Sequence, residues 1–272
     1  MRTGGNAALR PESSKSYTAG LVYSPSWAEK SLLADRIDFE ATFYKHKIDN
    51  AIQAPDAQTQ LDRCVDTLDP VFCSGITRGR TGDINGFNNT LRNLGTITTQ
   101  GYDFVINWTA PRLPIGRFST NWQTTYTQNY SAVATDSGLA EPRAVGVEVR
   151  DSGIPRWKST FRLNWALKPF TASWAVRYLS SLTEQCGDAT GLSTCSNSAQ
   201  GTNKLGATVY NDFQASYALP ELYKVKSSIS IGVNNIFNVD PPVCVSCSLN
   251  GYDASNYDIY GRFGYVEATI RF

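Results

Sequence analysis

The last stretch of the chain, residues 261–272, constrains the fold most because its apolar and polar residues alternate strictly. Successive side chains of a β-strand point to opposite faces. One face would therefore carry Gly264, Val266, Ala268, Ile270 and Phe272, while the other carries Tyr265, Glu267, Thr269 and Arg271. This pattern predicts a strand with one apolar and one charged face, which runs to an aromatic final residue.

The same alternation recurs along the chain and predicts nine long antiparallel strands. The other eight predicted strands are residues 14–24, 36–47, 95–109, 116–131, 157–165, 170–178, 205–219 and 225–237. The connections between consecutive strands alternate between short and long. In an up-and-down sheet, all short turns then lie at one end of the strands and all long loops lie at the other. This layout is typical of a transmembrane β-barrel, so we expect an all-β, antiparallel, up-and-down barrel portion that is incomplete at nine strands.

A secreted β-sandwich is the alternative fold for such a pattern. Its strands average nearer five or six residues, however, and its loops need not sort by length. The aromatic residues gather near strand ends, which favours the interfacial girdle of a barrel. The members of this group are Trp27, Trp108, Tyr126, Tyr130, Trp157, Tyr178 and Tyr217.

The composition narrows the classes of function. Aromatic residues make up 12% and charged residues 18% of the chain, which suits strands better than helices. The net charge of +1 gives no electrostatic reason to expect a nucleic-acid partner. No apolar run of about 18 residues is present, which excludes a transmembrane helix but not a barrel. The first residues lack the apolar core of a signal peptide, so the sequence is either cytosolic or a piece whose export signal lies upstream.

The six cysteines form three close pairs, all in the long connections. Nearest-neighbour pairing predicts the disulfides Cys64–Cys73, Cys186–Cys195 and Cys244–Cys247, which indicates an oxidising compartment. Metal binding at the C-x-x-C of residues 244–247 is the alternative. A single histidine and the lack of a second C-x-x-C argue against zinc, and the flanking residues do not resemble a redox motif at a helix start.

The charged residues of the strands fall on the face opposite the apolar one. A charge facing lipid at the bilayer midplane costs about 2–4 kcal/mol, so we expect these side chains to face the lumen of a barrel in a network of mixed sign. The predicted lumen-facing residues are Arg36, Asp38, Glu40, Asp103, Arg162, Arg177, Asp212, Glu267 and Arg271. A carboxylate dyad among the acidic members is the alternative reading.

No catalytic constellation is evident, and we expect neither an enzyme nor a cofactor or metal site. His46 is expected at the long-loop rim, where a lone histidine has no partners for hydrolase or metal chemistry. Residues 48–94 show no strand pattern and are expected to be irregular. Their glycine-rich run 75–86 follows no strand–helix pattern, which argues against a phosphate-binding loop.

Four motifs give the chain a family resemblance. They are Gly5-Asn6 with the run 9–17 (LRPESSKSY), Asn93-Leu94-Gly95 followed by Gly101-Tyr102-Asp103, the run 232–238 (GVNNIFN), and Tyr260-Gly261-Arg262 leading to Phe272. Together and in this order, they resemble the C-terminal part of the barrel domain of TonB-dependent outer-membrane receptors. The resemblance covers nearly all of residues 1–272.

The resemblance implies uptake of a scarce solute across the bacterial outer membrane, powered by the TonB energising complex. Implied partners are outer-membrane lipid, the barrel-assembly machinery, for which Phe272 would be the assembly signal, and a small-molecule ligand such as a siderophore, vitamin or oligosaccharide. Ligand contacts would lie in loops 50–93, 134–152, 184–203 and 239–257. Family members close about 22 strands around a plug domain. The plug is absent from this sequence, so we expect a receptor segment that does not transport alone. A small outer-membrane barrel enzyme or a secreted binding module are the alternative functions.

Overall fold

The computed structural model of the protein describes residues 2–29, 31–53, 57–93, 95–133, 144–149, 151–186, 195, 202–221, 226–247 and 250–271. The predicted assembly signal Phe272 lies outside these residues and stays a prediction. Contacts divide the chain into two compact units. The second, which comprises Tyr17–Lys45, Thr99–Tyr130 and Pro142–Phe272, contains most of the long strands.

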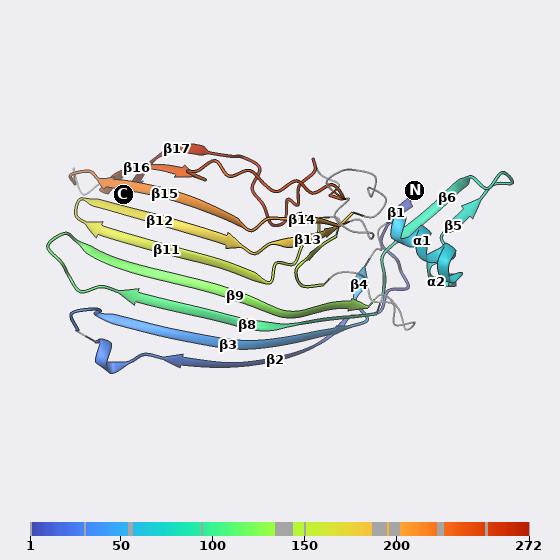
Figure 1. Cartoon of the computed structure of the whole chain (residues 1–272), viewed down its shortest axis with the longest axis horizontal. Helices are drawn as coiled ribbons and strands as arrows, with labels where there is room; N and C mark the ends of the chain where they lie inside the picture. Colours follow the sequence, from blue (N-terminus) through green and yellow to red (C-terminus); the bar gives the residue numbers. More distant parts are fainter. Residues whose placement is uncertain are drawn as a thin grey trace. The chain divides into compact units, whose positions relative to one another are not determined.

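The long strands form a single nine-stranded sheet in which neighbours in sequence are neighbours in space (Figure 1). In order across the sheet they are β2 (Ser13–Tyr23), β3 (Arg36–Asp49), β8 (Thr96–Thr109), β9 (Arg117–Val133), β11 (Trp157–Leu167), β12 (Phe170–Leu179), β15 (Thr208–Ala218), β16 (Lys226–Asn234) and β17 (Phe263–Arg271). All nine predicted strands are thus confirmed. The sandwich alternative is wrong, because these strands lie in one sheet rather than in two packed ones.

The strand register separates an apolar face from a polar face. Leu163 lies opposite Trp174, which lies opposite Phe213, and Phe213 lies opposite Val233. These residues define the apolar face. One position along, Arg162 lies opposite Ala175, and Ala175 lies opposite Asp212; these define the polar face. Residues in register point to the same side of a sheet. The alternation within each strand therefore gives the sheet one apolar face and one polar face.

Aromatic rings of the apolar face contact one another from strand to strand. Phe43 of β3 contacts Tyr102 of β8, with ring centroids 5.4 Å apart, and Tyr102 contacts Tyr126 of β9 at 6.4 Å. Tyr126 in turn contacts Trp157 at the start of β11, at 4.5 Å. These rings form a row across four strands, which runs from the middle of β3 and β8 through β9 to the start of β11.

Hydrogen bonds connect neighbouring strands across the polar face. Thr125 donates to the carboxylate of Asp103 at 2.6 Å, and Asn121 donates to Asn107 at 2.7 Å. Further along the sheet, the hydroxyls of Ser216 and Ser230 lie 2.8 Å apart. These pairs give the polar side chains partners within the sheet, so the face is built from satisfied polar groups.

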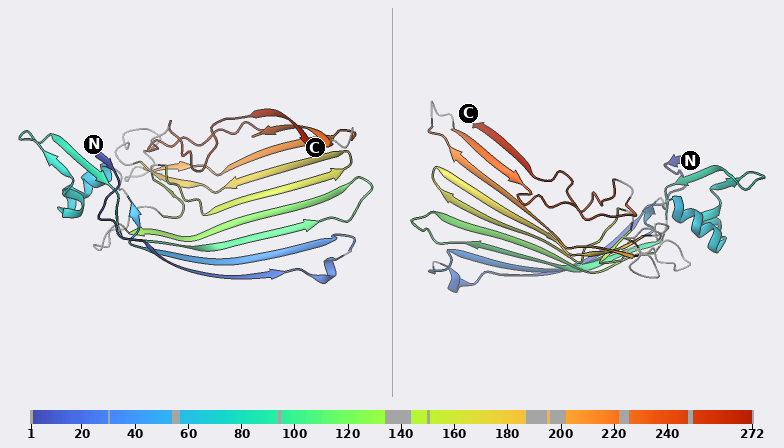
Figure 2. Two further views of the ribbon diagram at one scale, coloured as in Figure 1. Left: turned by 180° about the vertical axis from the view of Figure 1, so that it is seen from behind. Right: turned by 45° about the horizontal axis from the view of Figure 1, so that its top comes forward.

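The short connections lie together at one end of the sheet (Figure 2). They join β2 to β3, through a short helix η1 (Ser26–Ala28), and β8 to β9, β11 to β12 and β15 to β16. The β8–β9 turn requires Gly116, whose φ is +111° and whose Cβ position would lie 2.7 Å from the carbonyl oxygen of Ala166. The long connections carry all six cysteines, as predicted.

The first long connection contains regular structure that the sequence pattern did not predict. Residues 48–94 were expected to be irregular, but they include α1 (Ala57–Thr67), α2 (Pro70–Cys73), β4 (Ile52–Gln53), β5 (Ile76–Arg78), β6 (Ile84–Thr90) and β7 (Arg92–Asn93). Strand β1 (Arg2–Gly4) pairs in parallel with β6. Elements this short offer too few repeats for a periodicity to be read. The cap of α2, in which Asp69 accepts from the Val71 amide at 2.8 Å, is a local signal that could have been found.

The later long connections contain three short strands of their own. They are β10 (Val147–Glu148), β13 (Leu182–Gln185) and β14 (Thr202–Leu205), which form a small sheet in the order β10–β13–β14. Among the residues that the structure describes, no helix is both long and apolar enough to cross a membrane.

Candidate functional site

A compact group of loop residues lies beyond the long-loop ends of β11, β12 and β15, and we call it the loop cluster. It comprises the described parts of residues 144–153, 182–186, 202–206 and 239–258, and its apolar centre is formed by Leu179, Leu182, Leu205, Tyr210, Tyr252, Tyr257 and the disulfide Cys244–Cys247. Tyr210 and Cys244 are fully buried. The loop cluster therefore has a small apolar core of its own, which holds its polar side chains in fixed positions.

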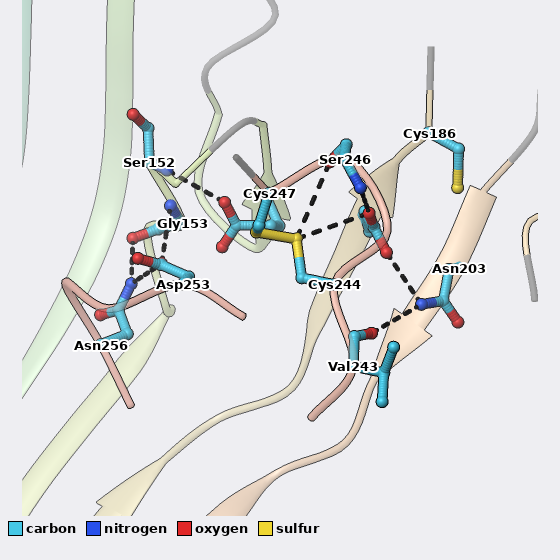
Figure 3. Close-up of a disulfide and its surroundings, with 12 residues drawn as sticks. Ser152, Gly153, Cys186, Asn203, Val243, Cys244, Ser246, Cys247, Asp253 and Asn256 are labelled. Carbon is cyan, nitrogen blue, oxygen red and sulfur yellow. Dashed lines mark hydrogen bonds between the residues drawn. A yellow bond between two sulfur atoms is a disulfide. The ribbon is translucent and has the colours of Figure 1, made fainter. Parts of the chain in front are cut away.

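Glu184 is a buried carboxylate that joins three segments of the loop cluster. One of its oxygens accepts from the backbone amide of Ser246, and the other accepts from the side chain of Asn203 at 2.8 Å. Asn203 also donates to the Val243 carbonyl at 3.1 Å. Figure 3 shows Ser246, Asn203 and Val243 near the Cys244–Cys247 disulfide. Each carboxylate oxygen of Glu184 therefore has a donor in the interior.

Glu148 and Asp253 form a second buried acidic group, and both side chains are fully buried. Asp253 accepts from the amide and hydroxyl of Ser255, at 2.8 and 2.6 Å, and from the side chain of Asn256 at 2.6 Å. Burial alone would raise the pKa of Asp253, but these donors outweigh it and hold the pKa below its usual value. Burial, followed by the adjacent Asp253, raises the pKa of Glu148 to about 8.

A cavity of about 510 Å³ lies beside the loop cluster, over the polar face of the sheet. Its lining comes from four elements and the last long connection: Arg177, Asp212, Asn234, Asn235, Asp258, Tyr260, Gly261 and Phe263. Arg177 forms ion pairs with Asp212, at 3.4 Å, and with Asp258. Its guanidinium also lies 4.9 Å from the ring centre of Tyr210. The cavity is slightly acidic, because its described lining contains one cation, Arg177, and two carboxylates, Asp212 and Asp258. Tyr260 also lines the cavity and is 86% exposed.

The motif 232–238 shapes the wall of this cavity through two asparagines in left-handed conformations. Asn235 has φ +50°, and its side-chain oxygen accepts from the Val239 amide at 2.8 Å. Its own backbone amide donates to the Asp212 carboxylate at 2.8 Å. Asn238 has φ +53° and accepts from the Arg262 amide at 2.9 Å. Asparagine tolerates this conformation better than most residues, so the motif turns the chain sharply out of β16 and returns it to β17.

The structure places the predicted lumen-facing residues on one face of the sheet. Arg162, Arg177 and Asp212 share the polar face by register. Glu267 and Arg271 follow through the pairing of β17 with β16, and Asp103 follows through its bond to Thr125. On β3, Asp38 accepts from Ser24 at 2.6 Å and from Arg36 at 2.7 Å, and Glu40 lies on the same side of the strand. That this face lines a lumen stays a prediction.

The carboxylates of the polar face do not form a dyad among the described residues. Asp38, Asp103 and Asp212 each have a partner of their own on a neighbouring residue or strand: Arg36, Thr125 and Arg177. His46 lies 2.9 Å from the Ser16 hydroxyl on β2. These contacts are those of a structural polar network rather than of paired acid and base groups.

The three disulfides pair the cysteines that are nearest in sequence, as the spacing predicts. Two groups bring a carboxylate near cysteine sulfurs, Glu148 with Cys244 and Cys247, and Glu184 with Cys186 and Cys195. The thiolate is the metal ligand that cysteine offers. Because these sulfurs are bonded to each other, neither group presents a thiolate to a metal ion.

A family model described as "TonB dependent receptor-like, beta-barrel" matches residues 1–236. The chain belongs to this TonB-dependent receptor family. Eight of the nine long strands of the up-and-down sheet, β2 to β16, lie within the matched residues. The match spans β1 to β16 and the two connections that carry the disulfides Cys64–Cys73 and Cys186–Cys195. The connection with Cys244–Cys247 and strand β17 lie beyond it.

Three solved structures of the same fold share only low sequence identity with this chain. A mutant form of the ferric enterobactin receptor PfeA from Pseudomonas aeruginosa is 17% identical, with a TM-score of 0.57 over 98% of this chain and 32% of that one. The iron transporter FrpB from Neisseria meningitidis is 12% identical, with a TM-score of 0.54 over 98% and 33%. The siderophore receptor PirA from Acinetobacter baumannii is 14% identical, with a TM-score of 0.53 over 98% and 32%.

The chain therefore spans about a third of the length of these receptors. A search of curated proteins found no match. Sequence reasoning placed ligand contacts in the loops but did not single out Glu148, Glu184, Asp253 or Asp258. Each is an ordinary acidic residue in a polar loop, and only its burial or its partner distinguishes it.

Proposed function

We propose that this chain forms part of the wall of a bacterial outer-membrane receptor that takes up a scarce solute with energy from the TonB complex. The observation that carries the proposal is the cavity bounded by Arg177, Asp258 and Tyr260, at the long-loop end of the polar face. A second cavity of about 400 Å³ continues along the polar face and shares Asp212 and Asn234 with the first. In a receptor, such a row of polar pockets would lead a solute from the loops toward the membrane interior.

The apolar face would contact lipid in this arrangement. Large side chains on it are exposed in the isolated sheet, among them Trp174, Phe213, Ile231 and Val266. In water, an apolar patch of this extent marks an interaction surface. The polar and apolar faces of a transmembrane barrel differ in this same way, which supports lipid as the partner of this face and the outer membrane as the location.

The solute is a siderophore, vitamin or oligosaccharide in this proposal. Siderophores are the first class to test, because PirA is described as a siderophore receptor and PfeA as the ferric enterobactin receptor. We propose no catalytic role, since members of the family act as transporters.

The placement of the two faces is tested by fluorescence quenching after the chain is refolded into phospholipid vesicles. In one single-tryptophan variant the reporter is Trp174 on the apolar face, and in the other it is introduced as Tyr265→Trp on the polar face. We expect lipids brominated on their acyl chains to quench Trp174 strongly and the polar-face reporter weakly, with acrylamide in water doing the reverse. Equal quenching by brominated lipid would overturn the proposal.

Solute capture is tested in a full-length receptor that contains this chain, with ferric enterobactin as the first probe. Loss of the exposed ring in Tyr260→Ala should weaken binding by about tenfold, since stacking on an aromatic side chain contributes about 1 kcal/mol or more. The matched control is Tyr17→Ala, which removes an exposed ring of β2 that lies outside the cavity. Equal effects of the two changes would remove the cavity from the binding site.

A further inference from the structure

Glu148 and Asp253 bring together two loops that are far apart in sequence. Gly153, which follows β10, donates its amide to Asp253 at 3.3 Å, and its carbonyl accepts from Asn256 at 2.8 Å. Figure 3 shows Ser152, Gly153, Asp253 and Asn256 side by side. A Cβ at Gly153 would lie 2.1 Å from Glu148 Oε2 and 3.0 Å from Asp253 Oδ2, so the two carboxyl groups converge on the same small region.

If both carboxyl groups were ionised, one of their buried acceptor oxygens would lack a hydrogen-bond donor within the described part of the chain. Asp253 receives donors on both oxygens, from Gly153, Ser255 and Asn256. Glu148 Oε1 receives the Ser152 amide at 3.0 Å, whereas Glu148 Oε2 has no donor among the described residues and is buried. Its neighbour is the Asp253 carboxyl. Two carboxylates can only accept, and an unmatched buried acceptor is costly.

We propose that Glu148 is a neutral carboxylic acid in the folded protein and donates its proton to Asp253, so that this shared proton fastens loop 144–153 to loop 250–258. The donor missing from Glu148 Oε2 is then the acid's own hydrogen. Loss of the proton would set two negative charges against each other in the interior, and the two loops would separate.

The groups that face Glu148 from the elements packed against it favour its neutral form. Asp253 and Tyr257 come from the last long connection and Asp151 from the turn after β10, and the negative charge of Asp253 or Asp151 disfavours a second one nearby. Glu184 lies opposite Glu148 in the β10–β13 pairing. Lys158 interacts electrostatically with Asp253 rather than with Glu148. The disulfide Cys244–Cys247 bears no charge.

A divalent cation is the other way to hold two buried carboxyl groups together. The hydrogen bonds favour the proton, because Asp253 and Glu184 already use both oxygens to accept protein donors. A cation would have to share or displace these donors. A proton on Glu148 Oε2 adds one donor toward Asp253 and removes one of the two adjacent negative charges.

The proposed hydrogen bond from Glu148 to Asp253, which we call the latch, also positions a wall of the cavity. The carbonyl of Asp253 accepts from the Tyr257 amide at 3.0 Å, which closes a turn. The next residue, Asp258, donates its amide to the buried Tyr210 hydroxyl at 3.2 Å and pairs with Arg177. Opening of the latch would therefore loosen the cavity at Asp258. An effect on solute capture rests on the proposed function, but the latch itself does not.

The direction of the pH effect follows from the raised pKa of Glu148. A carboxyl group whose pKa rises from 4.5 to about 8 on folding favours the folded loops at acidic and neutral pH. Its contribution is fully present below the unfolded value and is lost as the pH rises through about 8. The latch should thus hold at neutral pH and open in mildly alkaline conditions.

Infrared spectroscopy of the whole chain, refolded in detergent, tests the proton directly. We expect a carboxylic-acid carbonyl band at neutral pH that disappears with a midpoint near pH 8 and is absent in Glu148→Gln. The matched control, Glu221→Gln, changes an exposed carboxyl group outside the loop cluster and should keep the band. Absence of the band in the unsubstituted chain at neutral pH would overturn the proposal, as would its loss on addition of calcium and return with chelator.

Hydrogen exchange of loop 250–258, corrected for the intrinsic pH dependence of exchange, tests the latch separately. Between about pH 6 and about pH 9.5, protection should fall by roughly tenfold or more in the unsubstituted chain. It should stay constant in Glu148→Gln, whose amide can donate to Asp253 at every pH. Peptides from β16 serve as an internal reference. Equal pH dependence in the two proteins would refute the latch.

Discussion

The nine-stranded sheet and the loop cluster are ordered by different kinds of information. In the sheet, the environment of a residue follows from its position in a two-residue repeat, and partners such as Leu163 and Trp174 lie on neighbouring strands. In the loop cluster, Glu184 bonds to Ser246 and Asn256 bonds to Gly153, across 62 and 103 residues of chain. The sheet can therefore tolerate many apolar exchanges, whereas the loop cluster depends on a few individual polar groups.

The difference is sharpest between Glu148 and Glu184, which lie opposite each other in β10 and β13. Both are fully buried, so burial alone does not separate them. Glu184 has a protein donor on each oxygen and Glu148 lacks one. Two identical side chains in one small sheet thus differ in chemistry because of the loops that meet them.

The largest expected effect comes from a charge on the apolar face of the sheet. Leu163→Arg should destabilise the chain in vesicles by about 2–4 kcal/mol, because the guanidinium would face lipid. The neighbouring control Asn164→Arg places the same charge on the polar face, beside a cavity, and should cost less than about 1 kcal/mol. Urea unfolding of vesicle-reconstituted protein measures both. Similar losses for the two variants would mean that the faces do not differ in their surroundings.

A single polar change should damage the loop cluster and leave the sheet intact. In Glu184→Gln, an amide replaces one carboxylate oxygen and faces a donor, either Ser246 or Asn203. We expect a loss of about 2–3 kcal/mol in the local opening free energy of β13 and β14. Hydrogen exchange measures it, with β12 and β15 as unchanged references. Equal loss of protection in those long strands would show that the two regions unfold as one.

Added volume where the loops meet should have a somewhat smaller effect. In Gly153→Ala, the new Cβ would lie 2.1 Å from Glu148 Oε2 and 2.7 Å from Leu182. Overpacking of this kind costs about 1–3 kcal/mol. Gly206→Ala is the matched control within the loop cluster, since nothing lies within 4 Å of its Cβ position. Exchange rates of residues 250–258 should rise only in the first variant.

The smallest expected effect concerns one hydrogen bond on the polar face of the sheet. Thr125→Val removes the hydroxyl that donates to Asp103 at 2.6 Å and should cost about 0.5–1.5 kcal/mol. Thr125→Ser keeps the hydroxyl and should behave like the unsubstituted chain. Urea unfolding is the measurement. A loss above about 3 kcal/mol would mean that the polar face also depends on individual contacts.

Prediction from the sequence succeeded where a repeat was long enough to read. The bounds of β3 and β8 differ from the predicted ones by only one or two residues, because each strand shows six or seven alternations. The disulfides followed from close spacing within loops. Helix α1 and strand β6, by contrast, lie in a region expected to be irregular, since short elements with partners far along the chain leave no periodic signal.

The candidate site was predictable only as a set of loops. Asp253 was expected within a ligand-contacting loop, yet nothing around it in sequence distinguishes it from the exposed Asp83. Arg177 and Asp212 were expected on one polar face, and the register placed them close enough to form an ion pair. Asp258 is a second carboxylate partner of Arg177, and it lies in a connection whose course no sequence pattern predicts.

The sequence by itself determined the number of long strands, the two faces, the order of short and long connections and the cysteine pairing, because each depends on residues close together in the chain. The tertiary structure alone decided which buried carboxyl group has donors and which has another carboxyl group as its neighbour. Burial and hydrogen-bond partners depend on the tertiary fold, which in the loop cluster brings together residues a hundred positions apart. The chemistry of Glu148 therefore emerges only when loops 144–153 and 250–258 meet.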